Sequence, residues 1–573
     1  MLNIKSFTNS ISKELFFRFP LVFIFMILCF FLAVFENNQI YLLEQKLQGK
    51  LFLSSFILIG FTLATYLYLE RKNLDKIKKI SFFLVSLLIV YLGVFTYEDS
   101  LLYLIFAAYL SITFSNFSNI KSTNYSILSF NMQVTNSVVF AFFSSFILGI
   151  GIKVILLTLK YLFSLTFFDL ISDEMMIFIS IIIFPTLVLA NIPKNIEPLK
   201  NSLKLKKAVE LLIKNILTPL ILIYTIILYA YFIKIIIIQE LPKGDLSWMI
   251  CIFLSLAILV KAFLKSIKEQ SIFTNFIDKY FIYLMIAPII FLDIAIYIRV
   301  SEYGVTQLRY CLIILSIWFS FLIVLEFIKK QFCIKSSLVS MFLLLLVASI
   351  TPLSSSNISL NSQFNRFKIV IEKYEVSNGK TKYNLKDLSL KKRVELTSII
   401  SYLSRSKKGM QFLNEFFNKN FKTKFEVFKY INMKEAYSYN LKREKSKYVQ
   451  EFNLYNLAYD SKGYDYVLNL ASSSNNNEKE YKLDDAKLKI VLKDSILNLK
   501  IDNNTISFDL KEIVKNWAKK NIKKIDNSNY KETIFIRKNK NIEYKLNIQS
   551  LSINEKEDNI KVDYINSILM IRR

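Results

Sequence analysis

The sequence contains no histidine, only four cysteines and only ten glycines among its 573 residues. Without histidine, zinc-protease motifs and the Ser-His-Asp and Cys-His arrangements of hydrolases are excluded. The four cysteines, Cys29, Cys251, Cys311 and Cys333, all lie in or beside apolar runs, so no disulfide framework is expected. The few glycines form no phosphate-cradling loop. The sequence therefore predicts no catalytic residue, no metal site and no cofactor.

Apolar residues, by contrast, are abundant. Hydrophobic residues make up 53% of the chain and aromatic residues 15%, and the mean hydropathy is +0.38. This excess is too large for a soluble enzyme of the same length. The chain also carries a net charge of +28, from 73 Lys and Arg against 45 Asp and Glu. We expect an integral membrane protein with basic surfaces.

Long apolar runs recur through the first 352 residues. A bilayer core about 30 Å thick requires about 20 apolar residues of helix, and eleven runs are close to that length or longer. The predicted transmembrane helices are residues 19–35, 51–69, 80–96, 101–117, 134–158, 175–192, 212–238, 246–264, 279–298, 308–327 and 335–352. The fold class predicted for this part is a polytopic α-helical bundle.

Basic residues are distributed unequally between the connections on the two sides of this bundle. The segments on the side of the N-terminus carry 20 Lys and Arg, and the opposite connections carry 5. Lys and Arg are retained on the cytoplasmic side of a membrane. The pattern therefore predicts a cytoplasmic N-terminus, and eleven crossings place the C-terminus outside. The basic runs at 70–79 and 200–207 are expected to anchor the bundle near anionic lipid.

The composition changes abruptly after Pro352, where the apolar runs end. The remaining stretch of about 220 residues holds 43 Lys and Arg and 26 Asp and Glu. We therefore predict two domains, a transmembrane helical domain at 1–352 and an extracytoplasmic domain at 353–573.

Two periodicities divide this second domain. Apolar residues at helical spacing predict helices over 362–373, 387–403, 409–418 and 511–524. Alternation with period two predicts strands over 487–493, 496–501, 505–510, 533–536, 541–548, 560–562 and 567–571. The Ser- and Asn-rich residues 472–480 predict a mobile loop. The domain is expected to be α+β with a mainly antiparallel sheet.

Two stretches of the sequence are similar to a known family. The first, residues 218–247, includes Thr-Pro-Leu, Tyr-Ala-Tyr and Leu-Pro-Lys-Gly, and the second, residues 299–310, reads Arg-Val-Ser-Glu-Tyr-Gly-Val-Thr-Gln-Leu-Arg-Tyr. These strings resemble the bacterial polytopic membrane family catalogued as domain of unknown function 4153. Arg18-Phe19-Pro20 and Gly463-Tyr464-Asp465-Tyr466 are similar to that family too. The resemblance implies a multi-span bacterial membrane protein with an appended domain, and it implies no activity.

Charged residues inside apolar runs are the sharpest chemical signal. A charge near the bilayer centre costs at least about 2.5 to 3.5 kcal/mol, and Lys153, Lys234 and Asp293 each stand among apolar neighbours. We predict that Lys234 and Asp293 lie close together, beneath an outer cluster. That candidate cluster consists of Arg299, Glu302, Tyr303, Arg309 and Tyr310. The alternative is that Lys234 extends to the interface and Asp293 caps a packed helix contact.

Membrane lipids are the partners that this composition implies. The predicted topology argues against nucleic acid for the second domain, whose net charge of +17 would instead meet lipid headgroups or anionic envelope polymers. The alternative is that lysine is enriched throughout the chain without a partner.

Two classes of function remain open. The favoured class is a non-enzymatic scaffold or sensor of the cell envelope with an outward-facing C-terminal binding domain, which predicts a tightly packed bundle. The other class is a transporter or lipid-handling protein that uses Lys234 and Asp293, which predicts a cavity reaching Asp293. A membrane enzyme has no motif to support it.

Overall fold

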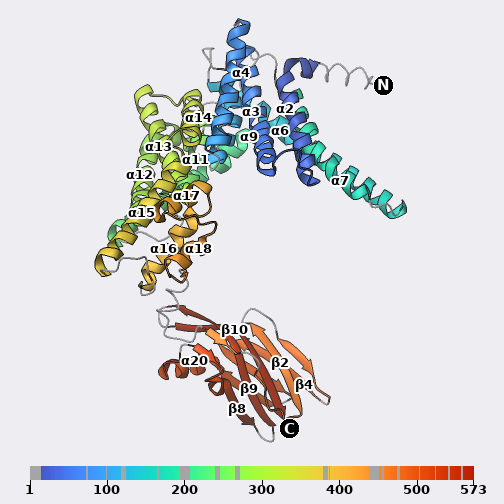
Figure 1. Cartoon of the computed structure of the whole chain (residues 1–573), viewed down its shortest axis with the longest axis vertical. Coiled ribbons are helices and arrows are strands. Elements are labelled where there is room, and N and C mark those ends of the chain that lie inside the picture. Colours follow the sequence, from blue (N-terminus) through green and yellow to red (C-terminus); the bar gives the residue numbers. More distant parts are fainter. Residues whose placement is uncertain are drawn as a thin grey trace. The chain divides into compact units, whose positions relative to one another are not determined.

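Figure 1 shows a computed structural model of the chain, in which helices form the N-terminal part and strands dominate the C-terminal part. The chain divides into two compact units, residues 1–377 with 402–422 and residues 378–401 with 423–573. The structure describes residues 14–573 apart from 72–74, 98–99, 118–123, 164–166, 194–206, 239–245, 265–266, 268–270, 379–384, 386–387, 438–450, 455–456, 474–477, 485, 503, 523, 540–541 and 557–558. Much of the predicted basic anchors at 70–79 and 200–207 therefore lies outside the described residues.

The first unit is a polytopic helical bundle, as predicted. Within the described residues, nine helical segments are long and apolar enough to cross a membrane, or ten if one bent pair counts as a single span. They are formed by α2 (Pro20–Asn37), α3 (Gln45–Leu69), α4 (Lys76–Tyr91) with η1 (Leu92–Thr96), α6 (Asn124–Phe163), α7 (Phe167–Phe178) with η3 (Ile179–Ile183) and α8 (Phe184–Ala190), α9 (Lys207–Leu211) with η5 (Leu212–Leu217) and α10 (Thr218–Ile238), α11 (Leu246–Leu264), α12 (Ile272–Tyr303) and α13 (Gln307–Lys329).

Each of the eleven predicted runs coincides with a helix. The two that fall short of a full span are α5 (Leu101–Ser115) and α14 (Ile334–Ile350), and α14 continues into α15 (Ser355–Asn378) after a bend of 54°. Several helices extend beyond the predicted runs, as α6 does with its 40 residues. Hydropathy identifies the segment that lipid can surround, whereas backbone hydrogen bonding continues the helix into polar sequence.

Two of the spans contain a π-helical turn shortly before a proline. The segment η3 precedes Pro185, and η5 precedes Pro219. Proline has no N–H group and its ring clashes with the carbonyl one turn earlier, so the backbone widens locally. At η5 the Ile213 carbonyl accepts from the Thr218 backbone N–H and also from the Thr218 hydroxyl, the latter at 2.7 Å.

The helices pack in two neighbouring groups. In one, α12 packs against α10, α11 and α13, and in the other, α3 packs against α2 and α5, while α5 also packs against α14. After the bend, α15 pairs with α17 (Lys407–Phe417) through rings such as Phe367 and Phe416, whose centroids lie 5.4 Å apart. The first unit therefore includes a helical pair beyond the membrane runs.

The second unit contains two four-stranded antiparallel sheets, as the alternation predicts. One has the strand order β2-β10-β9-β8 and the other β3-β4-β5-β6, while β1 (Glu451–Asn453) and β7 (Lys524–Asp526) form a short parallel pair. The strands of the two sheets are β2 (Tyr466–Ser473), β3 (Lys479–Lys482), β4 (Lys487–Lys493), β5 (Ile496–Ile501), β6 (Asn504–Asp509), β8 (Ile534–Asn539), β9 (Ile542–Lys556) and β10 (Asn559–Arg572). Residues 472–473 and 479–480 of the predicted loop are strand, and 474–477 lie outside the described residues.

One hydrophobic core joins both sheets and the helix α20 (Leu510–Lys519). It includes Leu499 from β5, Leu546 from β9 and Trp517 from α20. Asp509 begins α20 by accepting a hydrogen bond from the Glu512 N–H at 3.0 Å. The unit also contains α16 (Leu390–Leu403) and α18 (Lys424–Tyr430); a helix at α18 was not predicted.

Candidate functional site

The turn between α12 and α13 gathers most of the predicted cluster. Gly304 ends α12 with φ +67°, and its N–H donates to the Val300 carbonyl at 2.8 Å. A Cβ atom at this position would lie only 2.6 Å from Cδ of Arg366, in α15. Glycine is required here twice, for the left-handed backbone and for the close approach of α15.

Helix α15 holds this turn through side chains that bind its backbone. The Tyr303 carbonyl accepts from Arg366 Nη1 at 2.7 Å and from Gln363 Nε2 at 3.0 Å. Gln363 also donates to the Val305 carbonyl at 2.9 Å, and the Val305 N–H donates to the Ser362 hydroxyl at 2.9 Å. One face of α15 therefore satisfies the Tyr303 carbonyl and both backbone groups of Val305.

Arg309 and Tyr310 brace the same turn from α13. Arg309 donates to the Gly304 carbonyl at 2.8 Å and lies over the Tyr303 ring at 5.4 Å. The buried Tyr310 hydroxyl donates to the Leu353 carbonyl at 2.5 Å, at the bend between α14 and α15. These two side chains bind backbone carbonyls, so they stabilise the junction between the helices.

Of the remaining predicted residues, Glu302 alone joins the described contacts of the turn. Asp293 accepts a hydrogen bond from the Ser316 hydroxyl, so it links α12 to α13. Lys234 is exposed on α10, and within the described residues no ion pair joins it to Asp293. Glu302 contributes its carbonyl to Arg366 at 3.3 Å, and Arg299 is half-buried.

A buried ionic cluster that sequence reasoning missed joins α11, α12 and α13. Lys261 Nζ lies 2.8 Å from a carboxylate oxygen of Asp278 and 3.1 Å from one of Glu326. The side chains of Lys261 and Glu326 are only 3% and 8% exposed, and Lys261 also lies 5.2 Å from the Phe281 ring centroid. The signal was available, because Lys261 and Glu326 stand inside predicted apolar runs, about one turn or less from their ends.

A second ion pair closes the bundle at the start of α2. Arg18 binds Glu70 through two nitrogens, at 2.7 and 3.0 Å, and donates to the Ile192 carbonyl at 3.0 Å. This two-point geometry is the strong form of an Arg–carboxylate pair. Arg18 thus ties α2 to the end of α3 and to the residues after α8.

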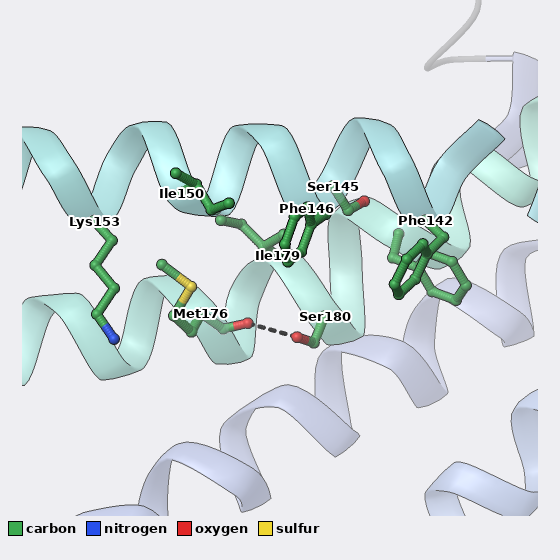
Figure 2. A pocket seen from close by; sticks show the side chains of 10 residues that line it. Phe142, Ser145, Phe146, Ile150, Lys153, Met176, Ile179 and Ser180 are labelled. Carbon is green, nitrogen blue, oxygen red and sulfur yellow. Dashed lines mark hydrogen bonds between the residues drawn. The ribbon is translucent and has the colours of Figure 1, made fainter. Parts of the chain in front are cut away.

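Two cavities lie elsewhere in the bundle. An apolar cavity of about 430 Å³ is bordered by α2, α3, α5, α6 and α8, and a second of about 370 Å³ lies between α6 and the helix formed by α7 and η3. Figure 2 shows the second cavity, with Lys153 extending from α6 toward the neighbouring helix. Neither cavity has Lys234, Asp293 or Arg299 in its lining.

In the sheet unit, one carboxylate collects three donors. Glu543 on β9 lies 2.7 Å from Lys538 Nζ and 3.4 Å from Arg572 Nη2, and it accepts from the Tyr464 hydroxyl at 2.8 Å. The hydrogen bond from Lys538, followed by that from Tyr464, holds the pKa of Glu543 below its usual range. Within the described residues, no group of three or more cysteine and acidic side chains is placed to hold a metal ion.

The sequence profile of the family described as "Domain of unknown function (DUF4153)" matches residues 21–370, which is more than half of the chain. The chain belongs to the DUF4153 family. The matched part of this DUF4153 protein runs from α2 into α15, and it includes the turn at Gly304 together with its partners Gln363 and Arg366. The family resemblance of the 299–310 string is thereby confirmed.

A second comparison gives a relative from Pasteurella multocida (strain Pm70), described as an uncharacterized protein. It is 33% identical over 108 residues, which cover 19% of this chain and 18% of that protein. No solved structure matches this DUF4153 protein. The membership and the apolar helices together make the chain an integral, multi-pass membrane protein.

Proposed function

We propose that this DUF4153 protein is a non-enzymatic scaffold or sensor of a bacterial cell envelope, whose membrane helices hold a C-terminal binding domain on the outer face. The observation that carries the proposal is that the polar cluster around Gly304 holds the protein's own backbone. Its side chains bind the backbone of the turn and connect the bundle to α15. Groups used in this way stabilise a junction and are not available to a substrate.

The proposed orientation rests on the basic residues of the connections. Twenty Lys and Arg on one side against five on the other favour a cytoplasmic N-terminus. With the C-terminal domain outside, its net charge of +17 favours anionic headgroups or envelope polymers as its binding partners, and it leaves nucleic acid out of reach. The transporter alternative, with Lys234 and Asp293, requires a cavity at Asp293, and the two described cavities lie elsewhere.

Labelling of single cysteines tests this orientation in whole cells. The four native cysteines are replaced by alanine or serine, and one cysteine is introduced on the exposed face of α20 by Lys515→Cys. A maleimide that does not cross membranes should label this variant in intact cells. Lys76→Cys, exposed at the start of α4, is the matched control and should react only after lysis. The reverse pattern would place the C-terminal domain in the cytoplasm and remove the proposed envelope role.

A further inference from the structure

The two membrane cavities lie next to each other along α6, and we call them together the groove. Ser180 and Phe184 line both of them, so their walls extend from Lys153 past η3 to Ile192, which follows α8. The two volumes, about 370 and 430 Å³, are each typical of a ligand pocket. The span of α6 places the groove at the depth of the bilayer, and the exposed Phe146 and Ile150 in its wall leave it accessible to lipid.

The wall of the groove is shaped for an apolar chain. The larger cavity is lined by side chains such as Ile59, Leu63 and Val138, and Phe146 and Ile150 continue the surface toward Lys153 (Figure 2). Gly149 adds no side chain on the α6 side of this passage, where a Cβ would just touch Met176 Sδ at 3.4 Å. Most of the polar groups in the wall are bound internally, as the Ser180 hydroxyl is to the Met176 carbonyl at 2.8 Å.

Two polar groups in the lining lack a partner among the residues that the structure describes. The Ser145 side chain is 7% exposed, and its hydroxyl has no hydrogen-bond partner among the described residues. Lys153 is exposed and forms no ion pair with any described residue. One unneutralised cation at the end of an apolar groove is complementary to one kind of molecule, an amphiphile with a negative head.

We propose that this groove binds a single anionic phospholipid of the surrounding bilayer, with an acyl chain along α6 and η3 and its phosphate at Lys153. The position of the lysine agrees with this assignment. Lys153 lies five residues before the end of the predicted apolar run 134–158, about 7.5 Å along the helix axis, so its long side chain can reach the headgroup region. The ammonium group binds a phosphate as a point charge. This site does not depend on the proposed scaffold function.

The test uses the full chain in detergent and native mass spectrometry with phosphatidylglycerol or zwitterionic phosphatidylcholine added. The unmodified protein should retain one phosphatidylglycerol in preference to phosphatidylcholine. Lys153→Gln should reduce that preference about fivefold, which corresponds to one basic side chain near a headgroup. Lys153→Arg should restore it. Lys234→Gln, which removes another exposed lysine of a span outside the groove, should leave it unchanged.

A steric variant tests the path of the acyl chain. Gly149→Leu should reduce retention of both lipids, and cross-links from a phosphatidylglycerol with a photoactivatable acyl chain should disappear from the peptides of α6 and η3. Ser145→Leu provides a second variant if Gly149→Leu reduces thermal stability. Equal loss with Lys153→Gln and Lys234→Gln, or cross-links unaffected by both steric variants, would overturn the proposal and leave only annular lipid.

Discussion

The two units of this protein use charge in opposite ways. In the membrane unit, Lys261 is buried and lies between two carboxylates, within the contact of three helices. In the sheet unit, Lys489 makes similar distances to Glu478 and Glu480, but all three side chains are substantially exposed. Similar distances do not imply similar energies, because solvent screens the exposed pairs, whereas the side chains of Lys261 and Glu326 are almost inaccessible to it.

Removing the buried lysine should produce the largest effect. Lys261→Met removes the cation that lies 3.1 Å from the buried Glu326 carboxylate, so the membrane unit should lose about 3 to 5 kcal/mol of stability. The measurement is unfolding of the full chain in mixed detergent and SDS, in a Trp517→Phe background where fluorescence reports Trp248 and Trp318 of the membrane unit.

The matched variant in the sheet unit is Lys489→Met, followed through Trp517 with the other two tryptophans replaced by phenylalanine. Its effect should be much smaller than that of Lys261→Met. Combining Lys261→Met with Glu326→Gln should recover part of the loss, since the buried charge is removed. Equal losses from the two lysine variants would break the contrast between the units.

Replacing one glycine in each unit should reduce stability by an intermediate amount, and by more in the membrane unit than in the sheet unit. Gly304→Ala adds a Cβ to a left-handed residue and directs it against Arg366, so we expect a loss of about 1 to 3 kcal/mol in the membrane unit. In the sheet unit Gly463 also has a positive φ, +81°, but the nearest atom to its added Cβ lies 4.0 Å away. Gly463→Ala should therefore show the backbone cost alone, and be the smaller of the two.

The double variant Gly304→Ala with Arg366→Ala separates the two causes at the membrane turn. It should relieve the steric conflict but not the backbone strain, and it also removes a donor to the Tyr303 carbonyl. Unfolding in detergent measures both variants. If Gly304→Ala loses no more stability than Gly463→Ala, the close packing of α15 does not add to the cost of the substitution.

The pH dependence of the sheet unit should be the smallest effect. The pKa of Glu543 is lowered in the folded protein, chiefly by the hydrogen bond from Lys538. Its contribution to stability is therefore complete above the unfolded pKa of about 4.3 and is lost as the pH falls through the lowered folded pKa. Acid titration followed by Trp517 fluorescence should show this loss, and Glu543→Gln should flatten that part of the curve.

Local sequence patterns predicted the elements better than their ends. The alternation in β4 and β5 predicted both strands at their observed bounds, because one face of each strand packs in the core. β9 is much longer than predicted, since Asn and Gln interrupt the pattern while the pairing with β10 continues through register shifts. A strand continues as far as its neighbour offers backbone hydrogen bonds, so alternation alone does not give a strand's length.

The candidate site was predicted in part, and for an identifiable reason. The string 299–310 indicated the right segment, but its partners Ser362, Gln363 and Arg366 lie more than fifty residues away. Likewise, Lys234 and Asp293 were singled out for their apolar neighbours, whereas the described ionic cluster forms at Lys261. From the sequence alone, a charge near the end of an apolar run is expected at the membrane interface. Whether it is buried depends on how the other helices pack around it.

The sequence by itself determined which part of this protein is surrounded by lipid and which part by water. Apolar runs without water-binding groups must enter lipid, and alternating polar and apolar residues must form half-buried strands, because both follow from the transfer of single segments out of water. The tertiary structure decided which polar groups meet. Whether Gly304 approaches α15, Lys261 is enclosed or Lys153 stays open to a groove depends on the positions of several helices at once, and no local pattern encodes those positions.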